Sequence, residues 1–249
     1  MRGSRFAVLA DIHGSSWALE AVLADIRRRG ADEVLDLGDI LYGPLDPAGT
    51  AEIHRAAGIV AIRGNMDRLL VEPLPAKPTP TLAFSRESLS PEVISWLAGL
   101  PKGLERGDLR LCHGTPDRDD AYLLEKVTET GATLRPETEI AALLGPGAAP
   151  VTLCGHSHVP RVIAVRGKLV INPGSVGLPA YTEEDPWPHV MEAGSPHARY
   201  VLLTRGGSPE MGGWEIEQIL VPYPWKEAAA RALSNGRPDW ARWIETGRG

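Results

Sequence analysis

Cysteine and long apolar runs are both scarce in this chain of 249 residues. With only two cysteines, Cys112 and Cys154, the sequence argues against a secreted fold stapled by disulfides. It has no run of 18 apolar residues, and the N-terminal stretch FAVLA is too short for a signal peptide because Asp11 follows it. We therefore expect a cytoplasmic protein that does not enter the membrane.

An excess of positive charge is also absent, since 26 Lys and Arg face 32 Asp and Glu, a net charge of −6. Proteins that coat a polynucleotide usually present a basic surface, so we expect no nucleic-acid partner. A small phosphate compound held by metal ions is compatible with this charge. The hydrophobic share of 43% is ordinary for a globular chain, and the length allows one α/β domain or two small ones.

The first part of the chain alternates predicted strands with predicted helices. Apolar runs at 5–10, 32–40 and 59–65 indicate strands, and apolar residues at helical spacing predict helices at 15–30 and 47–58. This βαβαβ order is typical of a largely parallel sheet covered by helices.

The second part of the chain is richer in strands. A Pro-rich extended connection at 71–80 and a helix at 90–101 lead into it, and residues 115–150 form an excursion of loops and helix. The further predicted strands lie at 108–114, 151–158, 161–175, 198–204 and 205–223, and the closing helices at 225–236 and 238–247. The whole pattern predicts two packed sheets with outer helices.

Side chains of the metal-binding type follow five of the predicted strands. They are Asp11, His13, Asp39, Asn65, His113, His156 and His158. Residues two apart on an extended segment point the same way, so Asp11 can converge with His13, and His156 with His158. The carboxyl ends of strands are also where open α/β sheets place their sites.

The mixture of these side chains indicates which ions they suit. Imidazole combined with carboxylate suits Mn, Fe, Zn, Ni or Co, and the set is too rich in nitrogen for Ca. Seven side chains exceed the three or four of a single catalytic zinc site. Two ions about 3.5–4 Å apart are the usual arrangement for in-line phosphoryl displacement. The sequence therefore predicts two divalent transition-metal ions that share one carboxylate.

The ordered motifs DIHG, LGDI, GNMD, CHGTP and GHSH resemble those of the calcineurin-like metallophosphoesterase superfamily. The resemblance spans about residues 6–204 and is nearest to the small prokaryotic phosphodiesterase branch. It implies an α/β fold, a four-layer α/β/β/α sandwich of two packed mixed sheets flanked by helices. It also implies one domain over 1–249, with excursions at 115–150 and 179–197 and a C-terminal helical segment at 225–247. Because relatives are often dimers or larger, a homo-oligomer is a further expectation.

The resemblance also implies a role for each site residue. One ion would be held by Asp11, His13, Asp39 and His158, and the other by Asp39, Asn65, His113 and His156. Asp39 would bridge the ions, and a hydroxide between them would attack phosphorus. Asp39, Asn65 and His113 are the residues we expect to be catalytic, with the Asn65 amide stabilising charge on the phosphate oxygens.

Met66 departs from the pattern of the superfamily. In many members a histidine follows the asparagine and is thought to protonate the leaving group, whereas a thioether has no proton to give. General acid catalysis is typically worth ~10²–10⁴-fold in rate, so we expect a substrate with a good leaving group, a small phosphodiester or nucleotide. The alternatives are a phosphomonoesterase, including a protein phosphatase, and a non-catalytic scaffold of the same fold that binds proteins.

Structural roles are expected for most other notable residues. His54 lies in a predicted exposed helix and should be solvated. His189 and His197 bracket an acidic loop that is either a surface excursion or a border of the active site. Asp67 either caps the following helix or supports the site. Both cysteines and the tryptophans of the C-terminal helices are expected to pack in the interior.

Overall fold

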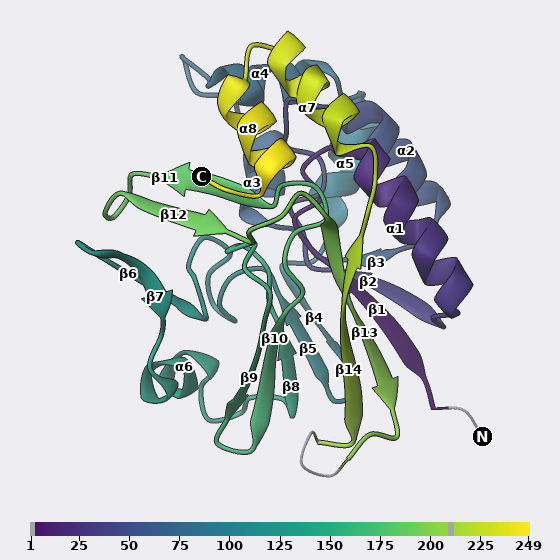
Figure 1. Cartoon of the computed structure of the whole chain (residues 1–249), viewed down its shortest axis with the longest axis vertical. Coiled ribbons are helices and arrows are strands. Elements are labelled where there is room, and N and C mark those ends of the chain that lie inside the picture. Colours follow the sequence, from purple (N-terminus) through teal and green to yellow (C-terminus); the bar gives the residue numbers. More distant parts are fainter. Residues whose placement is uncertain (1–2, 209–211) are drawn as a thin grey trace.

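The computed structural model describes residues 3–208 and 212–249 (Figure 1). Its strands are β1 (Arg5–Leu9), β2 (Glu33–Asp36), β3 (Val60–Ala61), β4 (Gly103–Arg106), β5 (Leu109–Cys112), β6 (Glu125–Thr128), β7 (Gly131–Leu134), β8 (Val151–Leu153), β9 (Arg161–Val165), β10 (Lys168–Asn172), β11 (Ala180–Glu183), β12 (His189–Glu192), β13 (Ala198–Arg205) and β14 (Trp214–Val221). Its helices are α1 (Ser16–Arg29), α2 (Pro47–Ala56), α3 (Asn65–Val71), α4 (Pro80–Glu87), α5 (Pro91–Gly99), α6 (Glu137–Leu144), α7 (Trp225–Ser234) and α8 (Pro238–Thr246).

Two five-stranded mixed sheets form the centre of the molecule. One has the order β14-β13-β1-β2-β3 and the other the order β4-β5-β8-β10-β9. The first runs parallel across β1, β2 and β3, and the second across β5, β8 and β10. Antiparallel strands complete their edges. The two mixed sheets with flanking helices confirm the predicted fold class.

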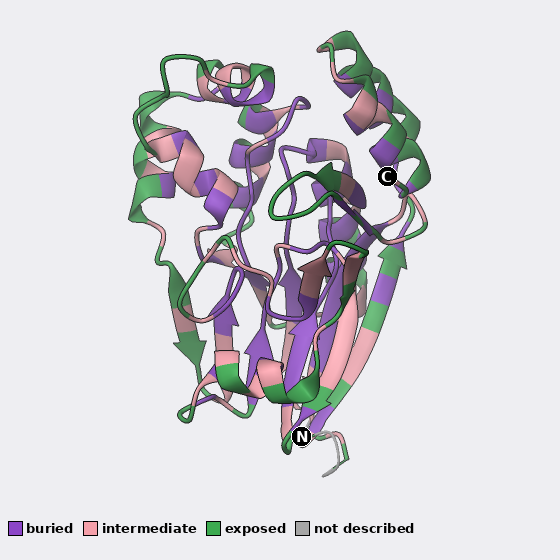
Figure 2. Ribbon diagram, turned by 90° about the vertical axis from the view of Figure 1, so that its left-hand side faces the viewer, coloured by how far each residue is buried: buried purple, intermediate pink, exposed green. Residues whose placement is uncertain are grey.

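The side-chain alternation of β1 shows why the layers stack in this way. Val8 belongs to the apolar layer between the two sheets, whereas Ala7 and Leu9 belong to a second cluster that includes the buried apolar residues of α1. Figure 2 shows buried stretches, in purple, along the central strands. Successive residues of a strand point to opposite faces of its sheet, so a strand that is apolar throughout is covered on both sides.

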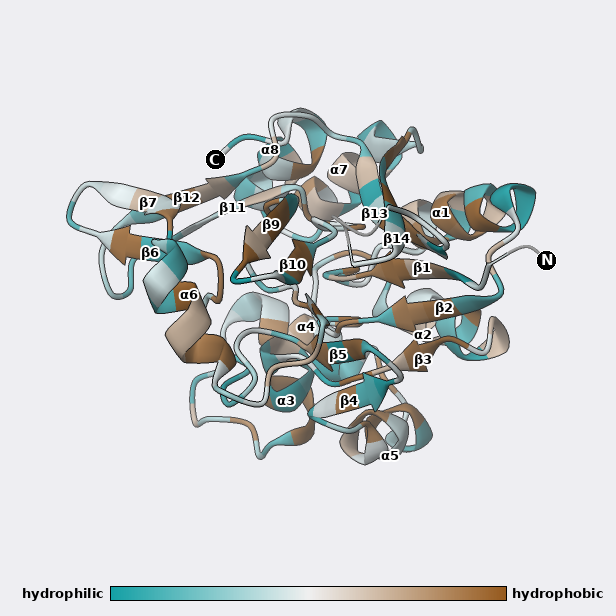
Figure 3. Ribbon diagram, turned by 90° about the horizontal axis from the view of Figure 1, so that it is seen from below, coloured by the Kyte–Doolittle hydropathy of each residue, from teal (hydrophilic) through white to brown (hydrophobic). Residues whose placement is uncertain are grey.

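The outer face of the second sheet is covered by α6, seen beside that sheet in Figure 3. Cys112 and Cys154 project into this layer, against Ile140 and Leu144 of the helix. Burial raises the pKa of the Cys112 thiol to about 12. The prediction that the cysteines are core residues is confirmed.

Three segments differ from the prediction. Residues 80–87 form α4, which the preceding prolines concealed, although Thr79 caps it by accepting the Leu82 N–H at 3.2 Å. The excursion at 115–150 contains the hairpin β6–β7 as well as a helix, and the loop at 179–197 contains the hairpin β11–β12.

Among the described residues no helix is both long and apolar enough to cross a membrane.

The prediction for His54 is wrong. Its side chain is 1% exposed, and its Nε2 lies 2.9 Å from Oδ2 of Asp36 at the end of β2. His54 belongs to the buried stripe of α2 together with Thr50 and Ala51, which precede it by four and three residues and so lie on the same face of the helix. A buried imidazole requires a polar partner, and Asp36 supplies it from a strand distant in sequence.

Candidate metal centre

Left-handed backbone marks the loops that carry most of the candidate ligands. The residues concerned and their φ angles are Asp11 (56°), His13 (53°), Asp39 (59°), His156 (69°) and His158 (59°). Among the described residues other than glycine, only Arg166 shares this conformation. It costs side-chain-bearing residues energy and is concentrated at functional sites. The ligands therefore converge through tight turns rather than along extended strands, which corrects the geometric argument made from the sequence.

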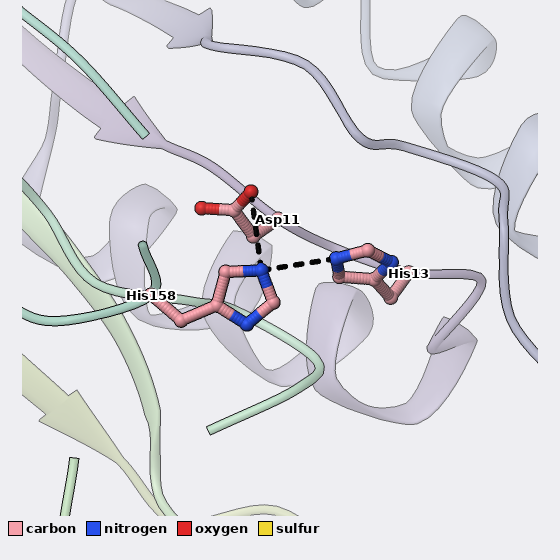
Figure 4. Close-up of side chains that lie close together, drawn as sticks. All are labelled: Asp11, His13 and His158. Atoms are coloured by element: carbon pink, nitrogen blue, oxygen red, sulfur yellow. Dashed lines mark hydrogen bonds and ion pairs between the residues drawn. The ribbon is translucent and has the colours of Figure 1, made fainter. Parts of the chain in front are cut away.

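Asp11, His13 and His158 form the first group of potential ligands (Figure 4). His158 Nε2 lies 3.1 Å from His13 Nε2 and 3.4 Å from Asp11 Oδ1. All three side chains are buried, and Asp11 Oδ2 has no hydrogen-bond partner among the residues that the structure describes. A buried carboxylate oxygen without a donor is costly, so this atom is suited to a cation.

The hydrogen bonds of the two histidine rings in this group also favour a cation. Nδ1 of His13 lies 2.8 Å from the carbonyl of Tyr42, and Nδ1 of His158 lies 2.6 Å from the carbonyl of Leu178. A carbonyl only accepts, so each Nδ1 donates and each neutral ring turns a bare Nε2 into the site. Two lone pairs then face each other, which favours a cation between them. Carbonyl-anchored Nδ1–H groups are the usual support of metal-binding histidines.

Asp39, His113 and His156 form the second group. Asn65 Oδ1 lies 2.9 Å from His113 Nε2, so the asparagine joins this group. Asp39 Oδ2 lies 3.3 Å from His113 Nε2 and 3.8 Å from His13 Nε2, between the second group and the first. The structure thus brings all seven side chains close together, and the assignment of each of them to an ion stays a prediction.

The histidines of this cluster differ in the direction of their pKa shifts. Burial lowers the pKa of His13 to about 4, with His158 acting in the same direction. Burial also lowers the pKa of His156 to about 4, assisted by His113. Burial opposes the charged form of His113 too, yet Asp39 raises the pKa of His113 to about 10. The lowered pKa values keep His13 and His156 neutral, the form in which imidazole binds a metal, and the raised pKa of His113 shows that the neighbouring carboxylates favour a positive charge at its position. Both features fit a donor set for divalent transition ions.

Asp67 holds the turn that carries Asp39. Its buried carboxylate accepts the N–H groups of Asp39 at 2.8 Å, Ile40 at 2.9 Å, Leu41 at 3.3 Å and Gly64 at 3.1 Å. Gly64 allows this approach, because a Cβ there would lie 2.2 Å from Asp39 Oδ1. Of the two roles considered for Asp67, the structure combines both: it caps α3 and braces the loop of a candidate ligand.

A cleft of about 980 Å³ opens over both groups. Its walls come from the hairpins β6–β7 and β11–β12 and from α8. The acidic loop at 179–197 therefore borders the site, which settles the alternative left open by the sequence. Buried His189 lies behind this wall, with its Nε2 3.0 Å from the hydroxyl of Tyr122.

Three aromatic residues of the cleft were not predicted from the sequence. The Tyr122 ring stacks on His156 with centroids 4.7 Å apart, and Tyr181 packs edge-on against His158 at 4.7 Å. Trp240 of α8 packs edge-on against His13 at 5.7 Å. No local signal identifies these contacts, because each joins segments far apart in sequence.

Comparison with known proteins gives consistent matches along the chain. An uncharacterized protein of Methanocaldococcus jannaschii is 24% identical over 263 residues and covers 95% of each chain. A metallophosphoesterase of Sphaerobacter thermophilus has a similar structure, with a TM-score of 0.75, 24% identity and coverage of 98% of this chain and 99% of its own. A hypothetical protein of Pyrococcus horikoshii gives a TM-score of 0.71 at 21% identity, with 98% of each chain covered.

The two mixed sheets and flanking helices are therefore those of the metallophosphoesterase fold. Residues 5–190 match the model of the calcineurin-like phosphoesterase superfamily domain. The chain belongs to this superfamily, whose members depend on metal ions. The matched range ends within β12, so β13, β14, α7 and α8 lie beyond it.

Proposed function

We propose that this chain is a phosphodiesterase that uses two divalent transition-metal ions to hydrolyse small phosphodiesters or nucleotides. The position of Asp39 carries the proposal, because its Oδ2 lies within 4 Å of a histidine from each group. Asp11, His13, Asp39 and His158 would hold one ion, and Asp39, Asn65, His113 and His156 the other. The buried, partnerless Asp11 Oδ2 supports the same assignment.

Bound cations supply Lewis acidity, which lowers the pKa of water and neutralises charge on a phosphate. The chain's own residues supply rigidity. Backbone carbonyls fix the rings of His13, His113 and His158 through Nδ1, and the Met66 N–H fixes Asp39 Oδ1 at 2.8 Å. Asn65 is buried and lines the cleft, where its amide can contact a phosphate oxygen. Such preorganisation avoids rearrangement during the reaction.

Met66 favours substrates whose leaving group departs without a proton. Its side chain is half-buried and lines the cleft beside Asn65, where a proton donor would meet the leaving group. A thioether donates no proton, so the leaving group must depart as an anion or take its proton from water. Esters with weakly basic leaving groups are then the favoured substrates.

The experiment that tests this proposal compares two substrates with the same leaving group, under added Mn. We expect a higher kcat/KM for bis-p-nitrophenyl phosphate than for p-nitrophenyl phosphate, measured by release of nitrophenolate. A clear preference for the monoester would contradict the assignment and favour a phosphomonoesterase. If neither substrate is hydrolysed and the protein retains no metal after reloading, the result would favour the alternative of a non-catalytic scaffold that binds proteins.

Replacing Met66 by histidine tests the role of the missing acid. We expect Met66→His to raise kcat/KM for phenyl phosphate, a monoester whose phenolate leaving group is strongly basic, by about tenfold, the lower part of what general acid catalysis supplies. Met66→Leu is the matched control, since it changes shape without adding a proton donor, and should leave the monoester rate unchanged. Equal rates for the two variants would show that the form of the cleft, rather than proton donation, limits monoester hydrolysis.

A further inference from the structure

The charges that line the cleft are not evenly compensated. Each basic side chain of the described cleft wall is already paired with a carboxylate. The pairs are Arg118 with Asp120 at 2.9 Å, Lys126 with Glu139 at 2.6 Å, Arg135 with Glu139 at 3.0 Å, and Arg237 with Asp239 at 2.6 Å. These cations therefore offer an anionic substrate little additional attraction.

Two acidic side chains of the cleft have no such partner. Glu183 and Asp185 lie on the β11–β12 hairpin, are exposed and line the cleft. Within the described residues neither takes part in an ion pair, and the only side-chain hydrogen bond of Glu183 is to the N–H of Glu184, at 2.8 Å. Glu184 is equally exposed but does not line the cleft. The wall formed by this hairpin is therefore negative where it faces a substrate.

We propose that Glu183 and Asp185 determine specificity by repelling substrates that carry phosphates beyond the one being hydrolysed. This inference rests on the proposed phosphodiesterase function and narrows its substrate class to diesters with a single negative charge. Repulsion grows in proportion to substrate charge and acts over roughly the 8 Å Debye length of physiological salt. The two carboxylates repel a singly charged diester only weakly, and they repel a nucleotide with two or three phosphates much more strongly.

The remaining cleft surface suits uncharged, flat groups on either side of such a diester. Tyr42, Tyr122 and Tyr181 are half-buried and line the same cleft, so part of each ring faces it. Aromatic rings bind flat organic groups through their faces and edges without requiring charge. The cleft thus combines a centre for one phosphate with walls for neutral substituents.

A matched pair of substrates separates charge from chemistry. Thymidine 5′-(p-nitrophenyl phosphate) and the same compound carrying a 3′-phosphate share the scissile bond and the leaving group. We expect the wild-type enzyme to hydrolyse the first with a kcat/KM at least ~10-fold higher at low salt, and the ratio to shrink in concentrated NaCl. Glu183→Lys and Asp185→Lys should each lower the ratio by about fivefold.

Glu184→Lys is the control, because it makes the same charge change on the same hairpin outside the cleft, and it should alter the ratio by less than about twofold. Equal hydrolysis of both compounds by the wild-type enzyme would overturn the specificity proposal and leave the phosphodiesterase proposal intact. A shift in Glu184→Lys as large as in the two cleft variants would overturn it as well. If the wild-type enzyme hydrolyses neither compound, that result would contradict the phosphodiesterase proposal and, with it, the specificity proposal.

Discussion

The Asp39→Ala enzyme is expected to hydrolyse bis-p-nitrophenyl phosphate with a kcat/KM at least ~10³-fold below that of the wild type. Asp39 Oδ2 is the carboxylate atom that lies between the two groups, 3.3 Å from His113 and 3.8 Å from His13. Removing it takes away the proposed shared ligand and one of the two carboxylates among the seven side chains. The loss therefore falls on both proposed ions at once.

Two further variants separate charge from shape at this position. Asp39→Asn keeps the volume of the side chain and an oxygen for the Met66 N–H, and we expect it to be as inactive as Asp39→Ala. Asp120→Asn removes an exposed carboxylate from the same cleft and should retain activity within about threefold. Turnover by Asp39→Ala close to the wild-type rate would contradict the two-ion proposal.

The largest loss of stability is expected for Asp67→Ala. Its carboxylate accepts four buried N–H groups from two loops, and alanine would leave those donors without partners. An unsatisfied buried donor costs about 1–3 kcal/mol, so we expect the free energy of unfolding to fall by roughly 4 kcal/mol, allowing for partial hydration. For a chain of this length that corresponds to a fall in Tm of roughly 10 °C.

Asp46→Ala is the comparison for this measurement. Asp46 also caps a helix, but its side chain accepts one N–H, from Gly49 at 3.1 Å, so its loss should cost about 1 kcal/mol. Thermal unfolding of the metal-free proteins would rank the two variants without involving the site's ions. Equal Tm values for Asp67→Ala and Asp46→Ala would show that the Asp67 bonds do not stabilise the loop as described.

The sequence alone was sufficient to predict the sandwich and the meeting of seven side chains. Buried strands that are apolar throughout indicate sheets covered on both faces, and polar residues directly after them must gather at the strand ends. The backbone conformation at those residues was not predictable in the same way. Asp39 and His158 occupy left-handed turns, which Asp and His adopt more often than most residues but still rarely, so tertiary contacts must hold them.

Features that depend on distant partners could not be predicted from local patterns. His54 was assigned to solvent because its partner Asp36 lies on another element, and an isolated histidine in a helix gives no sign of burial. The burial of β12 alternates along the strand, but His189 is buried and Val190 is exposed, so its sequence lacks the apolar alternation that indicates pairing. Trp240 was expected to pack between helices, but its contact with His13 depends on how α8 folds back over the site.

The metal content of the protein tests the central claim most directly. The wild-type chain would be stripped with chelator, reloaded with Mn, freed of excess ions and analysed by mass spectrometry, beside Asp39→Ala treated identically. The two-ion proposal predicts two ions per chain for the wild type and at most one for the variant, since the shared ligand is lost. One ion or fewer in the wild type, or two in Asp39→Ala, would contradict it.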